Sequence, residues 1–435
     1  MANGSFPGDE NQASPRGVTA AEAAPAATSV PVAPPRRKSG LFPRVGHLPR
    51  VVWLLGFASL FNDLSSEAIF PLLPGFLVSL GAQMSFLGLI EGSADALSSV
   101  LKLVAGRLSD RGSRRLFVTG GYLLPAIARA GIALASAPAQ VLAARLLDRT
   151  GKGLRSAPRD AMLADSVKPT ERGRVFGLNR SMDHLGGAIG PLMSSGLMLL
   201  GLSLRKTFGV AAFFGLLAPV LLFLRLKDPR AIDPAHAASH APSARTRGGL
   251  QKGFAFYLSV CVLFAFGNSS DAFLLVRAHE LGWSQTAIPL LWFFHHLVKS
   301  AVAIPGGALS DRHSRAVVVS AGWFAYALTY VGFAFATAGW QMLALFLAYA
   351  LYHGLAEGAE RAIVADLAES GARGRAFGLY HGFVGAAALP AGFGTGWIWD
   401  HWGAAWALSI NAACAGIASL LLFWLAFAGT LRRAR

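Results

Sequence analysis

The sequence predicts an all-α membrane protein in which twelve transmembrane helices form two pseudo-symmetric bundles of six. Three observations support this fold class. Hydrophobic residues make up 54% of the 435 residues and charged residues only 14%, whereas soluble domains carry roughly 25% charged residues. Apolar segments of membrane-spanning length recur from residue 51 onward. Motifs of the first half of the chain return in the second half at a constant offset.

This composition argues against several classes of protein. The mean hydropathy is +0.47, and a soluble domain cannot hide so much apolar surface, because about a quarter of the unfolded chain's area stays exposed even in a 300-residue domain. The two cysteines, Cys261 and Cys414, lie in apolar runs without metal-ligand spacing. They therefore carry no information about zinc or redox compartment. We expect no disulfide scaffold, no metal site and no cofactor.

Residues 1–48 form the first distinct segment. They are rich in Ala, Pro, Gly and Ser, show no hydrophobic periodicity and end in a cluster of basic residues. The apolar core that a secretory signal needs is missing near Met1. We therefore expect a disordered cytoplasmic tail.

Twelve apolar segments follow the tail. A membrane-spanning helix needs about 20 predominantly apolar residues, and short polar joints separate segments of this kind at 51–79, 85–106, 116–136, 138–162, 175–200, 207–225, 254–279, 286–308, 316–337, 340–363, 376–397 and 403–428. The one long polar break divides them into two sets of six. The expected organisation is a tail at 1–48, an N-terminal bundle at 49–225, a cytoplasmic linker at 226–253, a C-terminal bundle at 254–430 and a basic tail at 431–435.

The basic residues behind the net charge of +16 are concentrated in the joints between the segments. Every second joint is basic, as shown by Arg111 and Arg114, Lys168 and Arg172, the break at 226–253, Arg312 and Arg315, Arg373 and Arg375, and the C-terminal arginines. The alternate joints are nearly free of Lys and Arg, apart from Arg205 and Lys206. Because cationic loops stay on the cytoplasmic side, we expect a multi-pass protein of the cell inner membrane with both termini cytoplasmic. The charge then needs no nucleic-acid partner.

An internal repeat with an offset of 201 residues relates the two halves. The run Gly106-Arg-Leu-Ser-Asp110-Arg111 matches Gly307-Ala-Leu-Ser-Asp311-Arg312, and the run 172–178 matches 373–379. Two matching six-helix halves in one membrane chain are typical of a secondary transporter with a substrate site near the midplane, between the halves.

The segment 106–115 resembles the signature loop between helices two and three of the major facilitator superfamily, whose pattern is Gly-x-Leu-Ala-Asp-Arg-x-Gly-Arg-Arg/Lys. This chain departs from it in having Gly112 one position early and Ser113 in place of the glycine. The resemblance spans about residues 50–430. It implies a conformational latch in which Asp110 lies near Arg375 and Asp311 near Arg174 while the cytoplasmic side is closed. The expected latch residues are Gly106, Asp110, Arg111, Asp311, Arg312, Arg174 and Arg375.

The fifth segment contains a spaced set of small residues, Gly177, Gly186, Gly190 and Pro191. It is similar to the antiporter motif of drug–proton exchangers in the same superfamily, although Ser194-Ser195 stands where that motif ends in Gly-Gly. Small residues permit close helix packing, and the proline bends the helix. The second half has Ala387 in place of Gly186. This asymmetry favours an exporter.

Ionisable residues within the segments are candidates for coupling and binding, since such residues face a cavity or a partner. Asp63 and Glu67 lie four residues apart on one helix face. They suit a proton carrier, because like charges close together in low dielectric compete for one proton. The alternative is that both form fixed ion pairs with the arginines of the fourth segment. Asp183 and His184 are further proton-coupling candidates.

The expected substrate cavity mixes both signs of charge with an aromatic ring. Its candidates are Arg145, Arg149, Arg180, Asp271, Trp292, His295, Lys299, His353 and Glu357. The basic members suit an anionic or zwitterionic organic solute. Histidine can titrate during transport, but a single histidine in a membrane helix also serves as a hydrogen-bonded packing residue.

These features predict a transporter that moves a small organic solute by alternating access, with proton-coupled efflux as the expected direction. The alternatives are a proton-coupled importer of an organic anion and a non-transporting membrane sensor or assembly protein. The run Gly151-Lys152-Gly153 is no phosphate loop, because neither Ser nor Thr follows the lysine, and no enzyme activity is expected. The expected partners are the solute, protons or another coupling ion, and lipid, with the protein as a monomer.

Overall fold

The computed structural model describes residues 48–111, 113–167, 172–226, 249–251, 253–369 and 372–428. These residues are almost entirely helical, and the described part contains a single isolated β-bridge, between Leu250 and Ala368. The expected cytoplasmic tail, most of the expected linker and the basic C-terminal tail lie outside the described residues.

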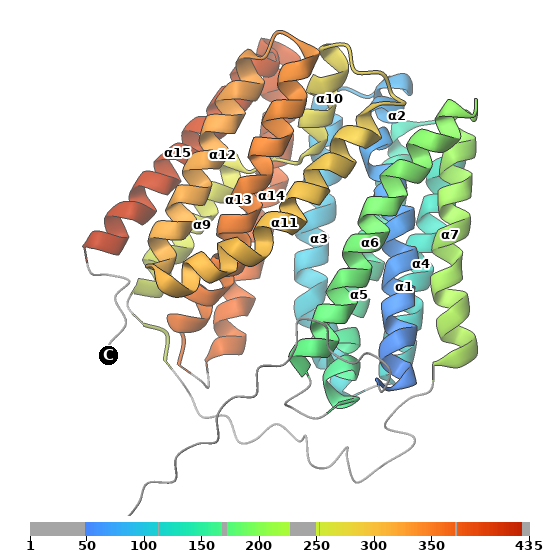
Figure 1. The fold of residues 1–435 in the computed structure, drawn as a ribbon, viewed down its shortest axis with the longest axis horizontal. Coiled ribbons are helices and arrows are strands. Elements are labelled where there is room, and N and C mark those ends of the chain that lie inside the picture. The colour runs from blue at the N-terminus through green and yellow to red at the C-terminus, as the bar shows by residue number, and fades with distance from the viewer. Residues whose placement is uncertain are drawn as a thin grey trace, which may run out of the picture. The chain divides into compact units, whose positions relative to one another are not determined.

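The helices of the first half run back and forth between the two ends of the bundle (Figure 1). Its helices are α1 (Arg50–Ile69), η2 (Phe70–Leu72), α2 (Leu73–Ser79), α3 (Met84–Arg111), α4 (Arg114–Leu134), α5 (Pro138–Asp165), α6 (Arg172–Leu199) and α7 (Leu204–Arg225). The elements α1, η2 and α2 form one interrupted helix. Pro71 and Pro74 stand in the first turns of η2 and α2, where a proline is tolerated because the first N–H groups of a helix have no intrahelical acceptor.

The second half repeats this plan. Its helices are α9 (Gly253–Gly267), α10 (Ala272–Glu280), α11 (Ile288–Arg312), α12 (Arg315–Phe335), α13 (Gly339–Asp366), α14 (Arg373–Trp402) and α15 (Ala404–Phe427). Residues 268–271 interrupt the first of the six helices between α9 and α10, although the sequence predicts one continuous segment at 254–279. The predicted fold class, twelve helices in two pseudo-symmetric bundles of six, is confirmed.

Only half of the twelve helices are apolar enough to cross a membrane by length and composition alone. Within the described residues these six are Arg114–Leu134, Leu204–Arg225, Gly253–Glu280, Arg315–Phe335, Gly339–Asp366 and Ala404–Phe427. The others include α3, α5 and α6, which carry most of the ionisable residues of the first half. Such helices are stable in a membrane when their charges face one another or a cavity.

The internal repeat is visible in the helix boundaries and in individual contacts. The helices α4 and α12 begin and end at positions 201 residues apart, and so do α5 and α13. Arg114 forms an ion pair with Asp165, and Arg315 forms the matching pair with Asp366. Each pair joins the start of one helix to the end of the next. The same local structure is therefore built twice.

Packing within the first half depends on small residues. The helix α1 lies against α6 and α7, and α4 lies against α5 and α7. A methyl group at Gly186 would overlap the carbonyl oxygen of Leu60, and one at Gly190 would overlap that of Leu64. Glycine at both positions thus lets α6 lie directly on the backbone of α1. In the second half, aromatic rings fill the core, as in the stacked pair Phe264 and Trp323, whose ring centroids lie 4.3 Å apart.

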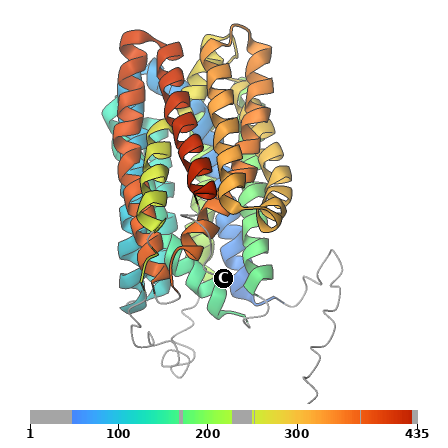
Figure 2. The ribbon, with the colours of Figure 1, turned by 90° about the vertical axis from the view of Figure 1, so that its left-hand side faces the viewer.

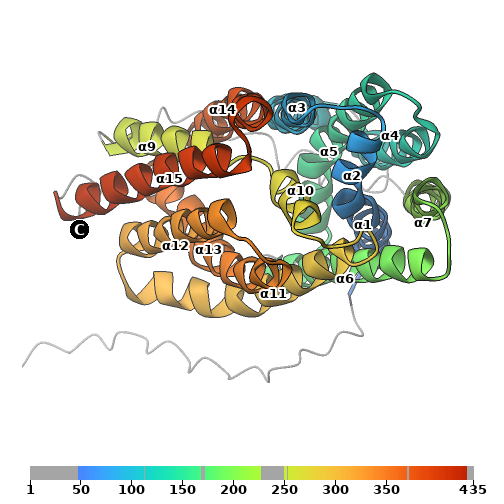
Figure 3. The ribbon, with the colours of Figure 1, turned by 90° about the horizontal axis from the view of Figure 1, so that it is seen from above.

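The two halves meet mainly through two helix pairs, α3 with α14 and α6 with α11, which lie toward the upper and the lower edge of the view in Figure 3. A methyl group at Gly88 would overlap the carbonyl oxygen of Gly392, so α3 and α14 approach backbone to backbone. The carboxylate of Asp400 accepts hydrogen bonds of 2.8 Å from the backbone N–H groups of Met84 and Ser85. It thereby satisfies donors at the start of α3 that have no acceptor within the helix.

We call the end of the bundle that contains Met84 the closed end. Here α2 lies against α10, and the hydroxyl of Ser195 donates to the backbone carbonyl of Thr286 over 2.8 Å. Figure 1 shows α6 and α11 separating toward the opposite end. The view turned by 90° in Figure 2 shows the helices running between the same two ends. At the opposite end the side chains of Arg312 and Arg375 are exposed.

Candidate functional site

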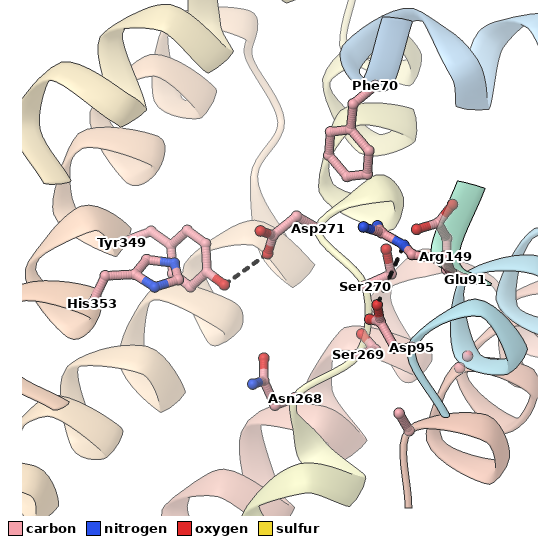
Figure 4. A pocket seen from close by; sticks show the side chains of 13 residues that line it. Phe70, Glu91, Asp95, Arg149, Asn268, Ser269, Ser270, Asp271, Tyr349 and His353 are labelled. Atoms are coloured by element: carbon pink, nitrogen blue, oxygen red, sulfur yellow. Dashed lines mark hydrogen bonds and ion pairs between the residues drawn. The ribbon is translucent and has the colours of Figure 1, made fainter. Parts of the chain in front are cut away.

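A cavity of about 280 Å³ lies between the two halves, and we call it the central cavity (Figure 4). Its lining comes from η2, α3, α5, the break at 268–271, α13 and α14. The lining residues are Phe70, Glu91, Gly92, Asp95, Arg149, Asn268, Ser269, Ser270, Asp271, Tyr349, His353, Ala388 and Gly392. Because both halves contribute, a solute here would contact both.

A second cavity of about 210 Å³ lies within the first half, and we call it the basic cavity. Its lining residues are Asn62, Asp63, Ser66, Glu67, Phe70, Arg129, Arg145, Asp148, Arg149, Lys152, Arg155, Ser156, Arg159, Arg180 and Asp183. Seven of them are cations and four are carboxylates. Phe70 and Arg149 line both cavities, so the two spaces adjoin at these side chains.

The carboxylates of Asp63 and Glu67 both line the basic cavity, as their four-residue spacing leads one to expect. Asp63 accepts a hydrogen bond of 2.8 Å from the side-chain amide of Asn62. Glu67 accepts one of 2.8 Å from the indole N–H of Trp292, which belongs to α11 in the other half. His296 of the same helix lies 4.0 Å from the same carboxylate oxygen. Glu67 thus forms a direct link between the two halves.

The arginines of α5 pair with α3 instead of α1. Arg145 is buried and forms a bidentate pair with Glu91, with N–O distances of 2.7 to 3.0 Å. The Arg149 guanidinium lies 3.7 Å from the carboxylate of Asp95. The expected alternative, fixed ion pairs of these arginines with Asp63 and Glu67, is therefore not the arrangement in this structure.

A further buried pair was not anticipated from the sequence. Arg129 of α4 lies 3.0 Å from the carboxylate of Asp148 and donates to the backbone oxygen of Asn62 over 3.0 Å. Both side chains of the ion pair are buried. The contact ties α4 and α5 to α1. A lone arginine in an apolar segment is the sequence signal that could have indicated it.

Two cations of the basic cavity have no carboxylate within 4 Å among the described residues. These are Lys152 and Arg155, three residues apart on α5. The guanidinium of Arg155 donates to the backbone oxygen of Gly121 over 3.0 Å and lies 4.6 Å from the ring centroid of Tyr122. Neutral groups hold this cation in place, and its charge stays uncompensated by a direct partner.

The other coupling candidates lie on α6. The carboxylate of Asp183 lines the basic cavity and lies 4.0 Å from Arg180. It also accepts a hydrogen bond of 3.3 Å from the side-chain amide of Asn179. The side chains of Arg180 and His184 are exposed. Of the two predicted proton-coupling candidates on α6, only Asp183 lines the basic cavity.

In the second half, Asp271 and His353 line the central cavity. The carboxylate of Asp271 accepts a hydrogen bond of 2.7 Å from the hydroxyl of Tyr349. The Nε2 atom of His353 is buried and has no hydrogen-bond partner among the described residues. Figure 4 shows Tyr349 and His353 on the side of the cavity opposite Glu91 and Asp95, with Asp271 between them.

The remaining cavity candidates line neither space. His295 is buried, and its Nδ1 atom lies 2.9 Å from the backbone oxygen of Phe346, which identifies it as a packing residue. Lys299 lies 3.6 Å from Glu357, which also contacts Arg361 at 3.3 Å. Within the part of the chain that the structure describes, no group of three or more His, Cys, Asp or Glu side chains is arranged to hold a metal ion.

The expected latch is only partly visible. The side chains at positions 106, 110, 111, 174 and 311 lie outside the described residues, as does that at position 177 of the helix-five motif. Arg312 and Arg375 are described and exposed. In the helix-five motif, Gly186 and Gly190 contact α1, and Pro191 lies inside α6.

Comparison with known proteins places this geometry in a family. The model of the Major Facilitator Superfamily matches residues 55–294 and 255–434. The chain is 30% identical over 360 residues to an uncharacterised MFS-type transporter, MJ1317, of Methanocaldococcus jannaschii, covering 81% of this chain and 89% of that protein. It is 24% identical over 354 residues to the multidrug resistance protein MdtH of Aeromonas hydrophila, covering 78% and 87%.

Solved structures agree on the fold. A mutant of the nucleoside transporter NupG superposes with a TM-score of 0.74 at 12% identity, covering 86% of this chain and 99% of that chain. A bacterial homologue of the human lysosomal transporter Spinster, in an inward-facing and unoccupied conformation, gives a TM-score of 0.65 at 16% identity over 88% and 95%. The chain is thus a multi-pass membrane transporter that belongs to the Major Facilitator Superfamily.

Proposed function

We propose that the protein exports a small organic solute by alternating access in exchange for protons. The observation that carries the proposal is the hydrogen bond between the Glu67 carboxylate and the Trp292 indole. It joins a group that can take up a proton to a helix of the opposite half. Asp63 supports proton coupling as well, since it lines the basic cavity and has no cation within 4 Å among the described residues.

Protonation of Glu67 would change the contact between α1 and α11. A hydrogen bond to a charged acceptor is roughly twice as strong as one between neutral groups. A proton on Glu67 therefore weakens the link to Trp292, which couples the protonation of Glu67 to the positions of α1 and α11. A ligand or proton shifts a conformational equilibrium only by its different affinity for the two states, and this contact supplies such a difference.

The proposed direction is outward, from the cytoplasm. If the basic joints face the cytoplasm, both termini lie there and the closed end faces outward. The structure then presents its cavities toward the cytoplasm, where an exporter collects its solute. The packing of Gly186 and Gly190 against α1 and the likeness to relatives named multidrug resistance proteins support export. We further propose that the protein acts as a monomer in the cell inner membrane.

The competing function is proton-coupled import of an organic anion. The excess of cations over carboxylates in the basic cavity favours this alternative. The two functions make opposite predictions for the side of the membrane on which the solute must be present.

Inverted membrane vesicles from cells that produce the protein test the proposal. Respiration acidifies their interior, which a quenched acridine dye reports. Export predicts that an organic solute added outside the vesicles releases protons and restores fluorescence. Import predicts that the fluorescence recovers only when the solute is loaded inside the vesicles. A panel of organic cations, anions and zwitterions of drug-like size supplies the solutes.

The matched variants are Glu67→Gln and Glu280→Gln. Glu280 pairs with Arg277 on the same helix at 2.8 Å and lines neither cavity, so its neutralisation should leave proton release unchanged. Glu67→Gln should abolish solute-driven proton release while solute–solute exchange persists. Transport that ignores both the pH gradient and the membrane potential would reject proton coupling.

A further inference from the structure

The two adjoining cavities carry opposite charge. In the basic cavity, seven cations face four carboxylates. The lining of the central cavity includes three carboxylates, Glu91, Asp95 and Asp271, and one cation, Arg149. Glu91 and Asp95 are paired with Arg145 and Arg149, which leaves Asp271 as the acid without a cation within 4 Å among the described residues. Any solute that occupies both spaces therefore meets a basic wall, formed by cations without a carboxylate partner, on one side of Phe70, and an acidic wall, formed by Asp271, on the other.

The negative side is built at the break between α9 and α10. Asp271 ends the break, yet its carboxylate caps no backbone group of α10. Among the described residues it accepts a hydrogen bond only from the neutral hydroxyl of Tyr349, and no cation lies within 4 Å of it. The Nε2 atom of His353 lines the same cavity and has no hydrogen-bond partner among the described residues. It accepts a hydrogen bond in the tautomer that carries the proton on Nδ1. An ammonium group supplies three donors and one positive charge, which match these acceptors.

The positive side is built on one face of α5. Lys152 and Arg155 line the basic cavity without a carboxylate partner within 4 Å in the described chain. Arg145 and Arg129 are already paired with Glu91 and Asp148. The unpaired cations are thus the ones left to bind an anionic group.

An aromatic ring separates the two sides. Phe70 lines both cavities and packs on Trp292, with ring centroids 5.1 Å apart. Its position at the junction favours a solute whose middle part is an aromatic ring, because aromatic rings pair in offset-stacked or edge-to-face contacts.

We infer that the transported solute is a zwitterion, with an anionic group bound by Lys152 and Arg155, an aromatic middle part beside Phe70, and an ammonium group bound by Asp271. This inference rests on the proposed transport function. A solute with a single charge would leave either the acidic or the basic wall desolvated without a partner, which costs binding free energy.

Binding of four rigid probes to the purified protein in detergent, measured by calorimetry, tests the inference without a gradient. The probes are 4-(aminomethyl)benzoate, its longer relative 4′-(aminomethyl)biphenyl-4-carboxylate, the methyl ester of the first, which keeps only the ammonium, and its N-acetyl form, which keeps only the carboxylate. We expect at least one zwitterion to bind about tenfold or more tightly than both single-charge analogues, since hydrogen bonds to charged groups contribute that much.

Two variants locate the charges. Asp271→Asn should remove the preference for the zwitterion over the N-acetyl form, and Lys152→Gln should remove the preference over the ester. Glu280→Gln serves as the control and should change neither preference. Equal or tighter binding of either single-charge analogue, unchanged preferences in both variants, or no binding of any probe at about 10 mM would overturn the inference.

The outcomes separate this inference from the proposed function. Zwitterion-selective binding without proton-driven flux would leave the binding site standing and reject proton-coupled export. Proton-driven flux of singly charged solutes, together with failed zwitterion binding, would reject the inference alone.

Discussion

Neutralising Glu91 should destabilise the protein far more than neutralising Asp95, one helical turn away on the same helix. Both acids face arginines of α5, so the pair forms a matched comparison. Glu91 and Arg145 have side chains only 3% and 9% exposed and approach to 2.7 Å. Asp95 is 57% exposed and lies 3.7 Å from Arg149. The two contacts thus differ in burial and distance but share helices and charge types.

The magnitude follows from what each substitution leaves behind. Glu91→Gln leaves the buried Arg145 without its counter-charge, and breaking a buried pair in this way costs about 3–5 kcal/mol. An exposed pair contributes about 0–1 kcal/mol. A change of 1 kcal/mol shifts the melting temperature by about 2–4 °C for a unit of 150–250 residues, the size of each half. We therefore expect a loss of about 6 °C or more for Glu91→Gln and less than about 4 °C for Asp95→Asn.

Thermal unfolding of the purified protein in detergent, followed by tryptophan fluorescence at one scan rate, measures both shifts. The double variant Glu91→Leu with Arg145→Met adds a second measurement, because replacing both members of a buried pair by apolar residues is often neutral or stabilising. It should melt well above Glu91→Gln. Equal shifts for the two single variants, or a double variant as unstable as Glu91→Gln, would refute the argument from buried charge.

Three further predictions concern the contacts between helices. Gly88→Val should push α3 away from α14 and expose thiols introduced at the closed end to an impermeant reagent, whereas Gly120→Ala, whose added methyl group has open space, should not. Asp400→Ala should lower the melting temperature by the equivalent of about 1 kcal/mol, the usual contribution of a lost helix cap, and an unchanged melting curve would contradict the capping role. Asp63→Asn should leave folding intact by size-exclusion chromatography but abolish solute accumulation in energised vesicles, and full accumulation would remove Asp63 as a proton carrier.

The sequence predicted the architecture well because its signals are long and periodic. Twelve apolar segments and a repeat of fixed offset need no knowledge of tertiary contacts. The break at 268–271 was missed, although Asn268-Ser-Ser-Asp271 offers four consecutive polar side chains that compete for backbone hydrogen bonds. An apolar stretch on both sides made the segment look continuous, and hydropathy alone does not register such a break.

The site was harder to predict because it depends on how each helix is rotated about its axis. The spacing of Asp63 and Glu67 placed them on one face, but no pattern in the chain indicated that Trp292 would reach Glu67. The ion pairs between α3 and α5 could have been predicted. Glu91 and Asp95 repeat the four-residue spacing of Arg145 and Arg149, as expected for two parallel neighbouring helices joined by ion pairs, since residues four apart share a helix face.

A zwitterionic solute has an electrical consequence that can be measured. Such a solute carries no net charge, so exchanging one molecule for one proton moves a single positive charge into the cell. A membrane potential of 100 mV, negative inside, then adds about 2.3 kcal/mol to the driving force. Release of 4-(aminomethyl)benzoate from proteoliposomes at equal pH on both sides should therefore quicken when valinomycin and a potassium gradient make the interior negative. A rate independent of the potential would mean that the exchange is electroneutral, and would contradict the pairing of one proton with a neutral zwitterion.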